Sequence, residues 1–194
     1  EKIDACARAL LAYGVRAGDA VSLCALAMPE AVYLLYAINK IGAIANMLVM
    51  NATEAEIHEK LAVTKSKVVI TVDLALEKIV QASKETSVKH IIGVSLAESM
   101  PCVIGTLYKW KSKVKQENCV LFSEFLKAGQ GKKIDCQEIK GDAPAVIAYT
   151  GGTTGKAKGV LLSNRAANAI AFQYKYADKV LDFQNGERFL DIIP

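Results

Sequence analysis

The sequence has little histidine and no closely spaced pair of cysteines. Its two histidines, His58 and His90, lie far apart, and none of its five cysteines falls in a Cys-x-x-Cys pair. The spacing typical of structural zinc sites is therefore absent. We expect His58 to lie solvated on the polar side of a helix and His90 to begin a strand, neither with a catalytic role.

The cysteines are odd in number, and no secretion signal precedes them. This combination predicts reduced thiols in a cytoplasmic protein. Apolar neighbours predict that the cysteines fill the core instead of acting as nucleophiles. The five are Cys6, Cys24, Cys102, Cys119 and Cys136.

The sequence also lacks an apolar run long enough to cross a membrane. The most apolar stretch, residues 31–50, is interrupted by Asn39 and Lys40, so it falls short of the roughly 18 uninterrupted apolar residues of a span. It predicts a buried helix, apolar on most sides from Val32 to Ile41, that leads into a strand. The amphipathic start of the chain does not resemble a signal peptide.

Neither sign of charge dominates the chain. Lysine and arginine number 24 against 20 acids, which gives a net charge of +4, so the composition does not indicate a nucleic-acid partner. Hydrophobic residues make up 52% of the chain and charged residues 23%, a mixture typical of globular proteins.

Helical and strand patterns alternate along most of the chain. Gly14 is expected to cap the first helix, Pro29 to begin the second, and a capping box from Thr53 to Glu56 to begin the third. This alternation predicts an α/β fold, a mostly parallel sheet flanked by helices on both faces. Strands are expected at 20–26, 44–49, 67–72, 88–94, 145–150 and 187–193, and further helices at 74–82, 120–128 and 163–176.

The pattern is lost between Ser95 and Gly141. Lysines alternate with other residues from Lys109 to Lys115, beside Trp110. This stretch fits a basic, aromatic patch for an anion or a nucleic acid, or an exposed edge strand whose lysines oppose pairing with other strands. We favour the edge strand.

The chemistry is concentrated in a glycine-rich loop that follows the strand at 145–150. The segment from Thr150 to Gly159 reads Thr-Gly-Gly-Thr-Thr-Gly-Lys-Ala-Lys-Gly. Glycines let backbone N–H groups converge on one anion, hydroxyls add donors, and lysine adds a positive charge. The combination indicates a polyphosphate site.

A Walker A loop is a poor match for this segment. That motif requires a glycine where Thr150 stands and a metal-binding hydroxyl where Ala157 stands, followed at once by a helix. Here a strand-like run, residues 160–162, follows the loop.

The loop instead resembles the phosphate loop of the adenylate-forming superfamily, which reads Thr-Ser-Gly-Thr-Thr-Gly-x-Pro-Lys-Gly. Gly151 stands for the usual serine and Ala157 for the usual proline. The resemblance continues upstream, through Gly14-Val15, Gly18-Asp19, Pro29-Glu30 and the Lys40–Ala43 segment. The loop positions that match in order are Thr150, Gly152, Thr153, Thr154, Gly155, Lys158 and Gly159.

This resemblance implies ATP-dependent activation of a carboxylic acid to an acyl adenylate, followed by transfer to coenzyme A. ATP, Mg²⁺ and coenzyme A are the implied cofactors, and a small carboxylate is the implied substrate. Lys158 would be catalytic, and Lys156 would be solvated. The implied nucleotide-binding residues are Thr150, Gly151, Gly152, Thr153, Thr154, Gly155 and Lys158.

The resemblance also implies that residues 1–194 form part of a large N-terminal domain. Residues 1–141 would be a first α/β subdomain, and residues 142–194 the phosphate loop and the start of a second region. The family's C-terminal domain, absent here, would be the intramolecular partner, so we expect this chain alone to be inactive. The alternatives are transfer to a carrier-protein thiol or another acceptor, a nucleotide-binding module without catalysis, and a structural domain whose loop is only a turn.

Overall fold

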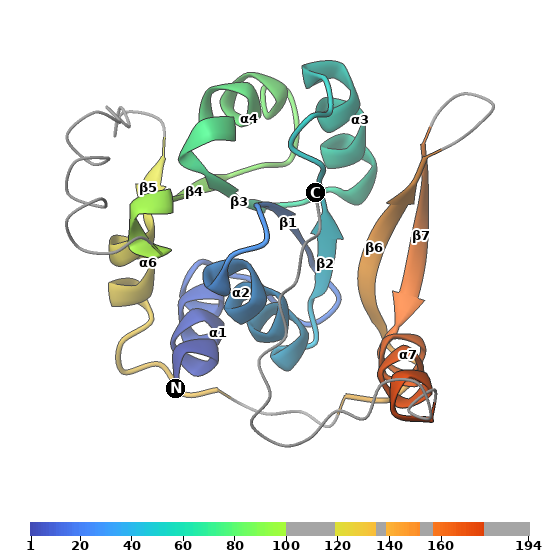
Figure 1. Ribbon diagram of the computed structural model, residues 1–194. Helices are drawn as coiled ribbons and strands as arrows, with labels where there is room; N and C mark the ends of the chain where they lie inside the picture. The colour runs from blue at the N-terminus through green and yellow to red at the C-terminus, as the bar shows by residue number, and fades with distance from the viewer. Residues whose placement is uncertain (100–118, 135–138, 152–156, 177–194) are drawn as a thin grey trace.

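Seven strands form one sheet in the computed structural model, which describes residues 1–99, 119–134, 139–151 and 157–176 (Figure 1). The strand order is β5-β4-β3-β1-β2-β6-β7. Every pairing is parallel except that of β7 with β6. The strands are β1 (Ala20–Cys24), β2 (Ile44–Met47), β3 (Val68–Val72), β4 (His90–Val94), β5 (Val120–Leu121), β6 (Pro144–Thr150) and β7 (Lys158–Ser163).

Helices cover both faces of the sheet, as the alternating pattern predicts. Figure 1 shows α3 and α4 on one side and α1 and α2 on the other. The chain moves from β1 to β2 in one direction and from β2 back to β3 in the other, so right-handed crossovers place the connecting helices on opposite faces. The helices are α1 (Lys2–Ala12), α2 (Pro29–Lys40), α3 (Glu54–Thr64), α4 (Leu76–Ala82), α6 (Phe122–Ala128) and α7 (Asn164–Tyr176), with short 3₁₀ turns at Asp73–Ala75 and Leu96–Ser99.

Local capping signals determine where these helices begin and end. Gly14, at φ +81°, follows α1, and the N–H groups of Gly14 and Val15 donate to Leu11 and Leu10, which is a Schellman motif. At the start of α3, the Thr53 hydroxyl accepts from the Glu56 N–H while the Glu56 carboxylate accepts from the Thr53 N–H. These caps confirm the predicted boundaries.

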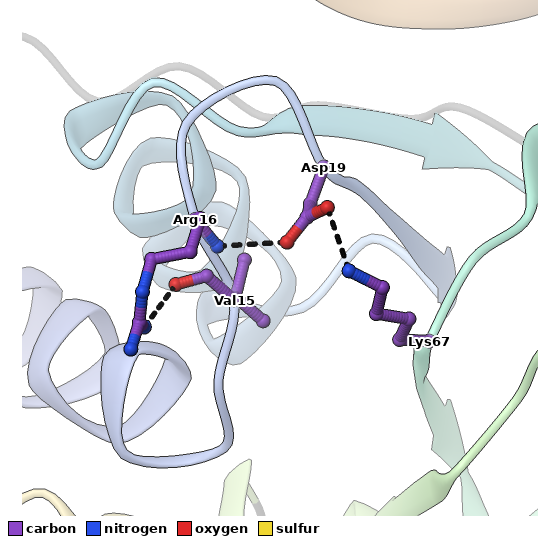
Figure 2. A network of polar contacts seen from close by, with 4 residues as sticks. All are labelled: Val15, Arg16, Asp19 and Lys67. Carbon is purple, nitrogen blue, oxygen red and sulfur yellow. Dashed lines mark hydrogen bonds and ion pairs between the residues drawn. The ribbon is translucent and has the colours of Figure 1, made fainter.

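The turn between α1 and β1 is fixed by one carboxylate. Gly18 takes φ +82°, as the third position of a type II turn requires. The Asp19 carboxylate accepts from the Arg16 N–H at 2.9 Å and pairs with the Lys67 ammonium at 3.1 Å (Figure 2). Because Lys67 immediately precedes β3, this carboxylate joins the starts of two adjacent strands.

The core lies between the sheet and its helices, and β3 is buried along its whole length. The prediction for α2 is wrong in part. Leu34 and Ile38 are fully buried, but Val32 is 50% exposed and Tyr36 59% exposed. A helix against one sheet face buries only a stripe of its surface, so apolar residues on its other side remain accessible. The expected strands at 109–115 and 187–193 lie outside the described residues.

Among the described residues, no helix is both long enough and apolar enough to span a bilayer.

Candidate functional site

The predicted phosphate loop connects the two strands of a hairpin. β6 and β7 pair antiparallel, with Tyr149 opposite Gly159 and Thr150 opposite Lys158. The Thr150 hydroxyl donates to the Lys158 carbonyl oxygen at 3.5 Å, a long hydrogen bond. Thr150 and Lys158 therefore stand side by side where the strands end.

Only part of the predicted site falls within the described residues. Thr150, Gly151 and Lys158 are described, and all three are exposed. Within the described part of the chain, the Lys158 ammonium forms no ion pair. The remaining predicted residues, Gly152, Thr153, Thr154 and Gly155, lie outside the described residues, as does Lys156.

The hairpin lies at the carboxyl edge of the parallel sheet. β6 pairs parallel with β2, so the end of β6 at Thr150 lies at the same edge as the ends of β1, β2 and β3. In open α/β sheets, ligands bind outside the carboxyl ends of the strands. The position of Thr150 at this edge agrees with a ligand-binding role for the segment that follows it.

A groove of about 380 Å³ separates α3 from the hairpin. Lys60 and Tyr149 both line it, and the Lys60 ammonium lies 4.3 Å from the centroid of the Tyr149 ring, a cation–π distance. Ala157 and Gly159 extend the groove to the base of the loop. A Cβ on Gly159 would lie 3.2 Å from Cε1 of Tyr149, so glycine at this position leaves room for the ring.

Burial makes two of the cysteines chemically inert. Cys6 and Cys24 are buried, and burial raises the pKa of both thiols, that of Cys6 to about 11. A protonated thiol is a poor nucleophile, so the prediction that these two residues fill the core agrees with the structure. Cys119 is half-buried, and its pKa is also raised by burial. Cys102 and Cys136 lie outside the described residues.

The prediction that His58 is solvated is wrong, whereas the prediction that His90 begins a strand is confirmed. His58 is half-buried, and its Nδ1 lies 3.0 Å from the carbonyl oxygen of Ala82. A carbonyl can only accept, so Nδ1 donates, and the ring links α3 to the end of α4. His90 begins β4, and its ring packs edge-on against Tyr13.

Sequence reasoning missed a buried polar network beneath the hairpin. The Tyr149 hydroxyl donates to Oδ1 of Asn46 at 2.8 Å, although 103 positions separate the two residues. The Asn46 amide donates in turn to the Ser22 hydroxyl at 2.7 Å. A polar residue within a short apolar strand was the only available signal, and it does not identify a partner.

No metal-binding cluster of three or more His, Cys, Asp or Glu residues occurs among the described residues.

Comparison with protein families gives a match over the whole chain. The model of the AMP-binding enzyme family matches residues 1–194. A 4-coumarate–CoA ligase from Humulus lupulus is 28% identical over 93% of this chain and 30% of its own length. A long-chain-fatty-acid–CoA ligase from Bacillus subtilis is 29% identical over 93% of this chain and 34% of its own length. The chain thus spans about a third of the length of these relatives.

Solved structures share the fold. The inhibitor-bound N-terminal domain of FACL13 from Mycobacterium tuberculosis superposes with a TM-score of 0.67 at 23% identity, covering 90% of this chain and 38% of that one. The anthranilate CoA ligase AuaEII, solved with anthranoyl-AMP, gives 0.67 at 22% identity, covering 84% of this chain and 28% of that one. At this identity, the likeness concerns the fold alone.

Proposed function

Because the chain belongs to the family of AMP-binding enzymes, we propose that the whole protein activates a carboxylic acid with ATP and transfers the acyl group to coenzyme A. A carboxylate oxygen attacks the α-phosphorus, the bond to the β-phosphate oxygen breaks, and pyrophosphate leaves. The thiolate of coenzyme A then attacks the acyl carbon and AMP leaves. Coenzyme A is favoured as acceptor because the relatives described above are CoA ligases.

The observation that carries the proposal is the hairpin within the region that the family model matches. It supports a phosphate-binding role because Thr150 and Lys158 lie opposite each other at the carboxyl edge of the sheet. We propose that the backbone and hydroxyls of residues 150–155 hold the β- and γ-phosphates. Lys158 would stabilise the charge that develops on the departing pyrophosphate, an electrostatic role of oxyanion-hole type.

The proposal divides the chain as expected from the sequence, with residues 1–141 as a first subdomain and residues 142–194 as the phosphate-loop region. Family membership implies ATP, Mg²⁺ and coenzyme A. We assign no step to Mg²⁺. The complete reaction is proposed for the whole protein, because this chain spans only about a third of its relatives.

Replacing Lys158 tests the proposed function. In the whole protein, Lys158→Ala should slow ATP–pyrophosphate exchange by about 10²-fold, the typical effect of losing one oriented donor to a developing anion. Lys156→Ala is the matched control, because it removes the same charge from the same loop, and we expect a much smaller change.

An exchange rate that Lys158→Ala leaves unchanged would overturn the proposal. Equal losses in the two variants would mean that the loop contributes only general positive charge. Titration of pyrophosphate against both variants separates a binding role from a structural one, since a loop that is only a turn gives identical affinities.

A further inference from the structure

The hairpin formed by β6 and β7 pairs with the rest of the sheet over only a short length. β6 spans seven residues, yet its registered pairing with β2 comprises only Ala45 with Val146 and Asn46 with Ile147. The distal end of β6, from Ala148 to Thr150, lies beyond this pairing. Among the described strands, β7 pairs only with β6. The position of Thr150, after which the predicted phosphate loop begins, therefore depends on contacts other than the pairing of β6 with β2.

The side chain of Tyr149 supplies such a contact. Its hydroxyl donates to Asn46 Oδ1 at 2.8 Å, and its ring lies 4.3 Å from the Lys60 ammonium on α3. The opposing Gly159 leaves space for the ring. Tyr149 is thus held at its hydroxyl by β2 and at its ring face by α3, one residue before Thr150.

Tyr149 binds to a network of four polar residues, Asn46, Ser22, Ser66 and Thr64. This network is rigid because its polar groups are hydrogen-bonded to one another. Asn46, Ser22 and Ser66 are fully buried. The Asn46 amide donates to Ser22 at 2.7 Å, Ser22 donates to Ser66 at 2.8 Å, and the Ser66 and Thr64 hydroxyls lie 2.9 Å apart. Thr64 donates to the Lys60 carbonyl at 2.8 Å, so the donors run in one direction from Tyr149 to α3. Fully satisfied buried networks specify a single arrangement of the groups that they join.

We propose that Tyr149 is a positioning residue for the phosphate loop: through Asn46 and the Ser22–Ser66–Thr64 network, it fixes the end of β6 relative to the sheet and α3. The inference rests on the proposed function, because it assumes that ATP binds at the loop. Tyr149 acts on the nucleotide through Thr150 and the loop, and not by contact with the reacting atoms.

The test separates the Michaelis constants of the two substrates. Tyr149→Phe removes only the hydroxyl and leaves Asn46 Oδ1 without its donor. In the whole protein, with a carboxylic acid that supports exchange, it should raise the KM for ATP about 5–10-fold, the size expected for one buried hydrogen bond. The KM for the acid should stay unchanged. Tyr36→Phe, which removes a hydroxyl from an exposed tyrosine on α2, should alter neither constant.

A second variant tests the contact at the ring face. Lys60→Met keeps the aliphatic stem but removes the charge over the ring, and it should raise the KM for ATP in the same direction. If Tyr149→Phe lowers the thermal midpoint but leaves the KM for ATP equal to that of Tyr36→Phe, the bond is structural only and the inference is overturned. A parallel rise in both Michaelis constants would overturn it as well. An unchanged rate of ATP–pyrophosphate exchange in Lys158→Ala would instead overturn the proposed function. The Tyr149→Phe result does not test that function.

Discussion

The Cys6 thiol makes the fold less stable at alkaline pH. Burial, followed by the nearby Glu30 carboxylate, raises its pKa from 9.0 to about 11. Between these two pKa values the unfolded chain has lost a proton that the folded chain keeps. The contribution of this thiol to the free energy of unfolding is therefore complete below pH 9 and is lost as pH rises toward 11. From about pH 8 to about pH 10, the free energy of unfolding should fall by about 1 kcal/mol through Cys6 alone.

Urea unfolding of the wild type and of Cys6→Ala at the two pH values measures this contribution. The variant should have the flatter pH dependence, whatever its stability at neutral pH. Equal slopes in the two proteins would show that Cys6 does not cause the loss.

At the scale of elements, Gly129 determines how closely α6 approaches α1. The sequence predicts only that this glycine ends a helix, and it does follow α6 directly. The structure adds a reason from packing: a Cβ at Gly129 would lie 2.5 Å from the backbone nitrogen of Ala9 and 2.8 Å from its Cα. Gly129→Ala must therefore separate the two helices, and overpacking of this kind typically costs about 1–3 kcal/mol.

The midpoint of denaturant unfolding measures the cost at Gly129. Gly141→Ala is the matched control, because its added Cβ would lie at an ordinary 3.5 Å from the flexible Arg165 side chain, and we expect little change. Similar midpoints for the two variants would contradict the close approach of α6 to α1.

Elements were predictable from the sequence where their signals are local. Pro29 and the Thr53–Glu56 capping box lie within a few residues of the helix starts that they specify, so the sequence alone was enough. The link between Tyr149 and Asn46 depends on how distant strands are ordered in the sheet, and no local pattern encodes it. For the same reason the apolar pattern of α2 could not predict that Val32 remains half exposed, since burial depends on which face of a helix meets the sheet.

The candidate site was likewise predictable from the sequence only where its signals are local. Residue types from 145 to 162 were enough to predict a strand, a glycine-rich loop and a second strand-like run, and both strands are observed, the second beginning earlier, at Lys158. The groove beside α3 and the anchor at Asn46 arise only from tertiary packing, since they join β6 to α3 and to β2, and β2 to β1. A sequence can thus indicate the phosphate-binding chemistry without indicating what holds it in place.

For the whole molecule, the order of the strands predicts a gradient of stability across the sheet. β3 lies between β1 and β4 and is buried throughout, whereas β7, among the described strands, pairs with β6 alone and is exposed at Val160 and Leu161. Local opening requires least free energy where few buried contacts are broken. Amide hydrogen exchange should therefore be slowest in β1 and β3 and fastest, among the strands described, in β7.

Exchange measured on peptides by mass spectrometry gives this order directly, with β3 and β7 compared in the same sample. Because the two sets of amides belong to one chain, solvent and temperature cancel in the comparison. Protection in β7 equal to that in β3 would mean that the hairpin opens only with the entire sheet. The pairing of just two β6 residues with β2 would then be no weak point, and the Tyr149 anchor would have little independent movement to restrain.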